Sequence, residues 1–207
     1  MTADGDHVTS PVVAVRPASL DDVDRIVDTM TTAFFNDPLW GPAFPDVELR
    51  AGQASAFWRL LVTSSLRYPH TLVTENVESA AVWIPPGGTE LSEAELDRFE
   101  DFLVSLCGRS VADGILTIAD QFEAARPSEP HFYLSLLGTH AAHRGSGWGM
   151  RLLRENLARV DALGVPVYLE SCNPANDERY HSVGFIDRDQ IISASGQVTT
   201  TMWRPGR

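Results

Sequence analysis

The spacing of apolar and polar positions changes several times along the chain, and each period predicts a type of secondary structure. Apolar residues recur every three or four positions, as one face of a helix requires, over 23–34, 47–66, 99–106, 111–125 and 150–160. Short apolar or alternating runs predict strands over 12–16, 71–74, 80–84, 131–137, 166–171, 185–192 and 197–203. A further short helix is expected around Tyr180, before Gly184.

Capping and helix-breaking residues mark the ends of these elements. Capping boxes, in which two side chains satisfy the free amides of a helix start, begin at Ser19 and at Ser92. The segment 36–45 holds a glycine and three prolines, so it is predicted to be a loop. The order of the elements predicts the α/β class with a mixed sheet. Residues 1–10 are expected to be a loose polar tail.

The composition limits the classes of function that the protein can have. Of 207 residues, 43% are hydrophobic and 21% charged, which is typical of a folded globular protein. The net charge of −12 disfavours nucleic-acid binding. An acidic surface either attracts cationic small molecules or only keeps the protein soluble. We find no apolar stretch of ~18 residues that would span a membrane and no secretory signal, so we expect a cytoplasmic protein.

All 16 basic residues are arginine. The absence of lysine excludes a lysine-dependent phosphate loop, a Schiff-base or pyridoxal-phosphate enzyme and a kinase. Cys107 and Cys172 indicate neither a disulfide framework nor a zinc site. His140 and His143 have no third ligand nearby, so no metal is expected.

The clearest motif is Arg144-x-x-Gly147-x-Gly149, between a predicted strand and a predicted helix. Glycines let the backbone approach a bound group closely, and free amides at a helix N-terminus bind phosphate. The alternatives are a glycine-rich turn without a ligand and a dinucleotide site of the Rossmann type. The second needs G-x-G-x-x-G, and the last glycine here has the wrong spacing.

Residues 131–185 resemble the core of the Gcn5-related N-acetyltransferase (GNAT) superfamily. The loop at Arg144, Gly147 and Gly149 matches the family motif, and the strand through Glu170 is followed in family order by Asn176, Tyr180 and Gly184-Phe185. The layout of the whole chain is most similar to small-molecule acetyltransferases of the puromycin N-acetyltransferase type. The resemblance implies a mostly antiparallel sheet, splayed between the fourth and fifth strands, with helices on both faces. It also implies one domain over 11–207, with a helical segment, 86–130, inserted between strands 3 and 4.

The resemblance further implies acetyl-CoA as co-substrate. Leu137, Gly138 and Thr139 would lie along its pantetheine arm and acetyl group, and Asn176 would contact the arm. The pyrophosphate would be bound by the loop Arg144, Gly145, Ser146, Gly147, Trp148 and Gly149. Ser146 stands where relatives often have a cation, which removes one phosphate contact.

For the chemistry, the resemblance places Tyr180 near the sulfur, where it would protonate the departing thiolate. The alternative is a tyrosine that only packs near a helix end. Glu170 is either the general base for the attacking amine or a structural carboxylate. Water, backbone carbonyls and His131 are other candidates for the base.

The acceptor is expected to be a primary amine of a small molecule, such as an aminonucleoside or another antibiotic. Phe34, Asp37 and Tyr133 are the candidate substrate contacts, although an aspartate before proline is commonly a turn residue. Further candidate aromatic walls, at least half of which should be core, are Phe35, Trp40, Trp58 and Trp83. Two alternatives are acetylation of peptides or proteins and a non-catalytic acyl-CoA-binding module. A monomer and a homodimer are equally compatible with the sequence.

Overall fold

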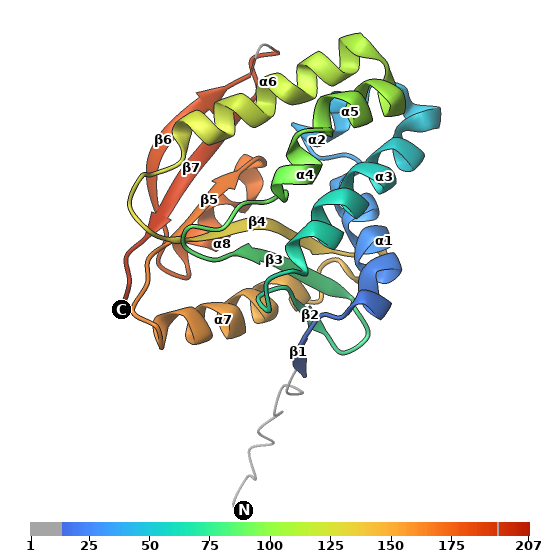
Figure 1. Cartoon of the computed structure of the whole chain (residues 1–207). Coiled ribbons are helices and arrows are strands. Elements are labelled where there is room, and N and C mark those ends of the chain that lie inside the picture. Colours follow the sequence, from blue (N-terminus) through green and yellow to red (C-terminus); the bar gives the residue numbers. More distant parts are fainter. Residues whose placement is uncertain (1–13, 194) are drawn as a thin grey trace, which may run out of the picture.

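The computed structural model describes residues 14–193 and 195–207. These residues form a seven-stranded sheet of order β1-β2-β3-β4-β5-β7-β6 (Figure 1). Every neighbouring pair is antiparallel except β4–β5, which is parallel. The strands are β1 (Val15–Pro17), β2 (Leu72–Thr74), β3 (Ser79–Ile84), β4 (Phe132–Thr139), β5 (Val167–Ser171), β6 (Ile186–Ile192) and β7 (Val198–Arg204). The expected tail at 1–10 lies outside the described residues.

Helices cover both faces of this sheet, as expected from the sequence. They are α1 (Val23–Phe34), α2 (Trp40–Ala43), α3 (Val47–Ser65), α4 (Glu93–Leu96), α5 (Phe99–Cys107), α6 (Arg109–Ala125), α7 (Trp148–Asp161) and α8 (Asp177–His181). Single 3-10 turns, η1 (Leu20–Asp22), η2 (Ala141–His143) and η3 (Pro174–Asn176), precede α1, α7 and α8. One apolar core lies between the sheet and α1, α3, α5 and α6, and a second lies beneath α7. The α/β class with a mixed sheet is confirmed.

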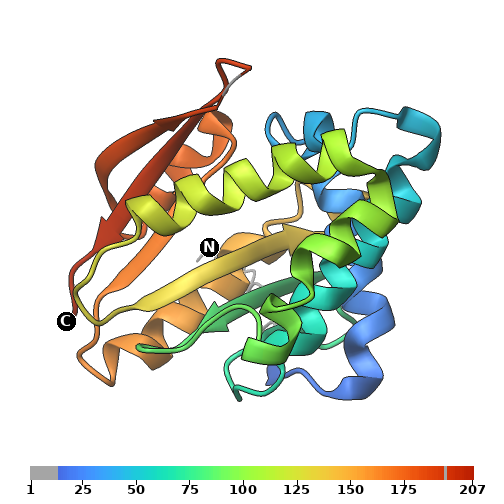
Figure 2. The same ribbon diagram turned by 45° about the horizontal axis from the view of Figure 1, so that its top comes forward.

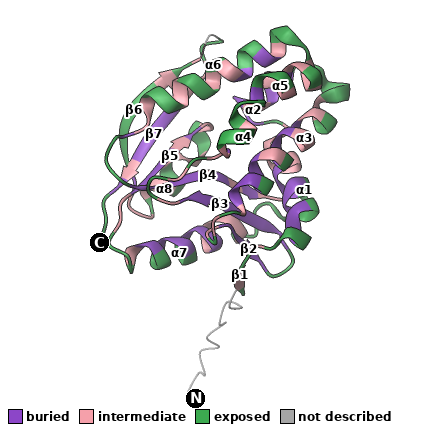
Figure 3. Cartoon of the chain, in the orientation of Figure 1, coloured by how far each residue is buried: buried purple, intermediate pink, exposed green. Residues whose placement is uncertain are grey.

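How far each strand is buried depends on its place in the sheet. The whole of β3 is buried, as its Ala-Ala-Val-Trp-Ile run requires, whereas β6 at the sheet edge is largely exposed (Figure 3). Trp83 of β3 belongs to the core beneath α7. The expectation that it could line a substrate pocket is therefore wrong, because alternate residues of a strand face opposite sides of the sheet.

Two local departures from the sequence prediction have clear causes. Within the segment predicted as loop, residues 40–43 form the short helix α2. The Asp37 carboxylate starts it by accepting the amides of Leu39 and Trp40 at 3.0 and 3.1 Å. Pro42 is tolerated there because it lies in the first turn. Behind the Ser92 capping box, residues 93–96 form a short helix of their own, α4, and the predicted apolar stripe at 99–106 lies wholly in the next helix, α5.

The helices α4 to α6 lie between β3 and β4 in the chain, and α6 crosses the front of the sheet from α5 toward β6 (Figure 2). The Gln121 side chain of α6 reaches the Ile192 carbonyl of β6 at 3.5 Å. Helix α6 therefore passes over the place where β4 and β5 run side by side. None of the helices in the described ranges is long and apolar enough to cross a bilayer.

Candidate active site

Strands β4 and β5 separate soon after they meet. They pair at Phe132–Val167 and at Tyr133–Tyr168, and the register goes no further, although β4 continues to Thr139 and β5 to Ser171. In β4, Ser135 is an extra residue opposite the Val82–Trp83 step of β3, a β-bulge that bends the strand. The bend leaves one edge of β4 without a strand partner among the described residues. This is the splay that the sequence resemblance implied.

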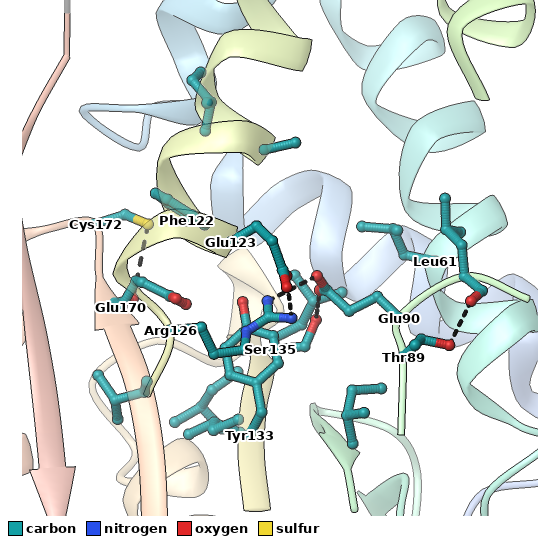
Figure 4. A pocket seen from close by; sticks show the side chains of 18 of the residues that line it. Leu61, Thr89, Glu90, Phe122, Glu123, Arg126, Tyr133, Ser135, Glu170 and Cys172 are labelled. Carbon is teal, nitrogen blue, oxygen red and sulfur yellow. Dashed lines mark hydrogen bonds and ion pairs between the residues drawn. The ribbon is translucent and has the colours of Figure 1, made fainter. Parts of the chain in front are cut away.

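A cavity of about 770 Å³ opens at the splay. It runs beneath α6 and combines an aromatic wall with several carboxylates, and Figure 4 shows part of its lining. Its lining includes Tyr180, Glu170, Asn176 and Leu137. The candidate acid, the candidate base and two candidate acetyl-CoA contacts therefore share one space. Its aromatic and charged lining includes Phe34, Trp40, Phe57, Trp58, Phe99, Phe122, Asp37, Glu90, Glu123, Arg126 and His131.

Tyr180 is positioned by the start of its helix. Asp177, the first residue of α8, accepts the hydroxyls of Ser171 and Thr200 at 2.6 and 3.2 Å, which fixes α8 against β5 and β7. One turn later Tyr180 packs its ring edge-on against Phe185, with 5.9 Å between ring centroids. Burial is the main reason that the pKa of Tyr180 is raised above its usual value. The hydroxyl therefore keeps its proton throughout the physiological range.

Glu170 is the penultimate residue of β5 and points into the cavity toward Arg126 and Tyr133 (Figure 4). Burial raises the pKa of its carboxyl to about 7, although neighbouring tyrosine hydroxyls and the charge of Arg126 act in the opposite direction. One carboxyl oxygen, Oε1, is buried without a hydrogen-bond partner among the described residues. Such a group exchanges its proton near neutral pH, as a general base must.

Asn176 and His131 also line the cavity. The Asn176 side chain accepts a hydrogen bond from Arg179 at 2.8 Å, which orients its amide at the start of α8. His131 is buried, stacks edge-on against Tyr168 and Trp203, and meets the Glu129 carbonyl at 2.6 Å through Nδ1. Burial lowers the pKa of His131, so the ring is neutral at neutral pH.

The glycine-rich loop lies between η2 and α7. Gly145 and Gly147 have φ of +80° and +77°, a conformation that only glycine adopts without strain, and Gly147 is the N-cap of α7. A Cβ on Gly149 would lie 2.8 Å from the Thr139 Oγ1, so this glycine lets α7 begin directly against β4. The first amides of α7, from Trp148 onward, have no intrahelical acceptor.

Arg144, the expected phosphate contact, also has hydrogen-bond partners within the protein. Its Nη2 donates to the Thr32 and Ala33 carbonyls of α1 at 2.9 and 2.8 Å. These bonds satisfy carbonyl groups at the C-terminal end of α1 and hold the loop against that helix. The Gly138 backbone of β4 lies close to α1, because a Cβ on this glycine would lie 2.7 Å from the Met30 Sδ.

Gly147→Ala is expected to destabilise the protein by about 1–2 kcal/mol, the cost of a left-handed conformation for an L-residue. No atom would obstruct the added methyl group, so the loss would come from the backbone alone. The control is Gly114→Ala in the exposed middle of α6, which should gain about 0.5–1 kcal/mol. Urea denaturation measures both. An unchanged midpoint for Gly147→Ala would contradict the left-handed geometry.

The three candidate substrate residues all line the cavity, and each of them also contacts other groups of the protein. Phe34 packs against Trp58, with 5.1 Å between centroids. Asp37 uses Oδ1 to start α2, the turn role noted above, and burial raises the pKa of its carboxyl. The ring of Tyr133 lies beneath the guanidinium of Arg126 at 4.2 Å. Trp40 and Trp58 line the cavity as expected, whereas Phe35 packs beneath Arg50.

Sequence reasoning missed a charged group in the cavity. Arg126 forms ion pairs with Glu123 at 2.8 Å and Glu90 at 3.4 Å, and Glu90 also accepts the hydroxyl of the bulge residue Ser135 at 2.5 Å (Figure 4). In the sequence, Glu123 and Arg126 have the spacing of an ordinary surface ion pair on a helix. No sequence signal places Glu90 beside them, since it comes from the loop after β3.

No protein-family model matches the chain. The crystal structure of a histone acetyltransferase HPA2 and related acetyltransferase from Corynebacterium glutamicum is 26% identical, with a TM-score of 0.71 over 95% of this chain and 98% of that one. Arylalkylamine N-acetyltransferase 2 from Aedes aegypti is 13% identical, with a TM-score of 0.64 over 94% and 99% of the two chains. A polyamine N-acetyltransferase from Drosophila melanogaster is 16% identical, with a TM-score of 0.66 over 93% and 99%.

These proteins share the fold along nearly their whole length, including a chain that is more than a quarter identical. The similarity to the bacterial structure covers 95% of this chain, so it extends over the sheet and most of the surrounding helices. The chain therefore has the fold of the Gcn5-related N-acetyltransferases, and its similarity to these acetyltransferases supports an acyltransferase.

Proposed function

We propose that the protein transfers an acetyl group from acetyl-CoA to a primary amine of a small molecule. The observation that carries the proposal is the single cavity that joins the β4–β5 splay to an acidic, aromatic space beneath α6. Tyr180, Glu170 and the aromatic wall all line this cavity. A donor that enters at the splay would meet an acceptor within it.

The splay and the adjoining loop suit acetyl-CoA. The open backbone of Gly145 and Gly147 and the free amides at the start of the 14-residue helix α7 suit the pyrophosphate. Ser146 and Trp148 belong to the same loop. The unpaired edge of β4 at Leu137, Gly138 and Thr139 would run along the pantetheine arm, with Asn176 opposite. Since the backbone supplies most of these donors, the absence of lysine is no obstacle.

In the proposed reaction, the amine attacks the thioester carbonyl, and a backbone amide near Leu137 stabilises the oxyanion. Tyr180 donates its proton to the departing thiolate as the C–S bond breaks, and it regains a proton from the nitrogen as the amide forms. Burial raises the pKa of the Tyr180 hydroxyl, and the same burial would raise the pKa of the thiol, so the donor and the acceptor of the proton remain matched.

Glu170 takes the proton that the attacking amine loses. An alkylamine arrives as an ammonium ion at neutral pH and must become neutral before it can attack. A carboxyl whose pKa is about 7 attracts the cation when it is ionised and is basic enough to accept its proton. An ordinary surface glutamate would be a much weaker base.

The acceptor is proposed to combine an amine with an aromatic or otherwise apolar part. Phe34 and Trp40 each pack against Trp58, with 5.1 Å between ring centroids in both pairs, and the three rings form a wall for such a group. The carboxyl groups of Asp37 and Glu170 supply negative charge beside this wall. Aminonucleoside and other amine antibiotics fit this description, as do the arylalkylamines and polyamines that the similar insect enzymes are named for.

Acetylation of peptides is the second candidate, because the bacterial similar structure is described as a histone acetyltransferase. The position of α6 argues against it. This helix crosses above the splay and contributes Phe122 and Glu123 to the cavity wall, whereas a peptide needs an open groove. A binding module without catalysis is disfavoured by a tyrosine and a titratable carboxyl in the same cavity.

The test is turnover on a panel of amines. Purified protein would be mixed with acetyl-CoA and puromycin, phenylethylamine, agmatine, spermidine or peptides with a free N-terminus, and free thiol would be followed. We expect turnover on a small amine with an apolar part and little on peptides. Faster turnover on peptides would favour the second candidate. Saturable CoA binding without turnover on any amine would refute catalysis.

A further inference from the structure

The charged group at Arg126 lies next to Glu170, and the reaction proposed above gives it no role. The groups that face the Glu170 carboxyl come from every side of the cavity. Tyr133 of β4 and Tyr168 of β5 are neutral, and Thr201, its β7 partner in the register, has no charge. The charged or titratable groups near it are Arg126, Glu90 and Cys172, and Glu123, Asp37 and His131 line the same cavity.

Arg126 is held rigidly. Its guanidinium lies 4.2 Å above the Tyr133 ring, and ion pairs to Glu90 and Glu123 hold it from two sides. Its side chain is only 19% exposed, and its Nε is buried without a hydrogen-bond partner among the described residues. The residue is the C-cap of α6, so the inserted helical segment brings this cation to the splay. A fixed, buried cation acts on its neighbours more strongly than an exposed one.

We propose that Arg126 is a positioning residue for Glu170: from its place above Tyr133 it favours the ionised form of the Glu170 carboxyl, which takes the proton of the acceptor amine. Glu90 opposes this action, because its negative charge lies beside the same guanidinium and also near Glu170. This inference rests on the proposed function, in which Glu170 is the base.

The two charges act on Glu170 with opposite signs, and this makes the inference testable. Without Arg126, burial and Glu90 would both favour the protonated carboxyl, and the pKa of Glu170 would rise. Without the charge of Glu90, Arg126 would be less neutralised, and the pKa of Glu170 would fall. A merely structural role would impair the enzyme in both variants without moving its pH dependence in opposite directions.

The experiment is the pH profile of kcat/KM for Arg126→Gln and Glu90→Gln. The acidic limb should move to higher pH in the first and to lower pH in the second. A limb displaced by one pH unit corresponds to an about tenfold change in kcat/KM below it. Arg126→Lys should restore the limb in part, since it keeps the charge without the planar stacking. The matched control is Arg109→Gln, at the exposed start of the same helix, where the arginine also pairs with a glutamate at 2.5 Å.

A second readout does not depend on turnover. The carboxyl of Glu170 can be titrated by carbon-13 NMR, with its signal assigned by its loss in Glu170→Gln. We expect the pKa of Glu170 to rise in Arg126→Gln, to fall in Glu90→Gln and to stay constant in Arg109→Gln. Shifts in the same direction, or none, would overturn the inference.

The two readouts also separate this inference from the proposed function. If the carboxyl shifts as expected but the kinetic limb stays fixed in every variant, Glu170 is not the base, and the role of Arg126 as its positioning residue fails with it. If no amine is turned over, the proposed function fails, and the NMR titration alone shows whether Arg126 controls the charge of Glu170.

Discussion

Tyr180→Phe is expected to lower kcat about a hundred- to a thousandfold, within the range usual for loss of a positioned general acid. The variant removes only the hydroxyl, and the ring keeps its contact with Phe185. The affinity for CoA should therefore stay close to that of the wild type. Stopped-flow or steady-state measurement of thiol release gives kcat, and calorimetry gives the affinity.

The control for this variant is Tyr68→Phe, whose hydroxyl accepts the exposed Thr89 amide at 3.1 Å and lies outside the cavity. It should leave kcat unchanged. Since the pKa of Tyr180 is raised, its hydroxyl should add no alkaline limb near neutral pH. Unaltered turnover of Tyr180→Phe at every pH would show that the proton donor lies elsewhere.

Glu170→Gln is expected to lower kcat/KM at pH 8 about a hundredfold or more, and to abolish an acidic limb near pH 7. The amide has the same shape but cannot accept a proton. A limb that persists in the variant would belong to the substrate amine, and a water molecule or His131 would then be the better candidate for the base.

The same substitution is expected to stabilise the protein at alkaline pH. The folded protein has a Glu170 pKa of about 7, against 4.5 for the group in an unfolded chain. Between these values the folded state holds a proton that the unfolded chain has released, so the free energy of unfolding falls as pH rises through this window. Glu170→Gln removes that loss, which is at most a few kcal/mol. Thermal unfolding should show a higher Tm for the variant at pH 8 and little difference near pH 4.5.

The elements were predictable where a local pattern specifies them. The α7 start follows from Gly147 and the apolar spacing after it, and β3 follows from a continuous apolar run. Helix α2 was not predictable, because the prolines and glycine of its segment favour a loop and a buried aspartate overrides that preference. The exclusion of Trp83 from the cavity likewise depends on which face of the sheet it occupies.

The sequence identified the site residues that belong to a motif and lie close together along the chain. It did not identify the site residues that come from distant segments. Tyr180, Asn176 and Glu170 lie within eleven positions of one another and line one cavity. Arg126, Glu90 and Ser135 come from three segments, and only the packing of α6 over the splay brings them together. Arg144 was found by its motif, but its bonds to α1 depend on where that helix ends.

The sequence by itself therefore determined the fold class, the glycine-rich loop and the candidate acid and base, because these depend on residue types at short, fixed spacings. Only the tertiary structure decided the electrostatic environment of Glu170. Burial and the charges of Arg126 and Glu90 act over a few ångströms in space, while the residues that carry them are separated by up to 80 positions along the chain. No local pattern in a sequence records such distances.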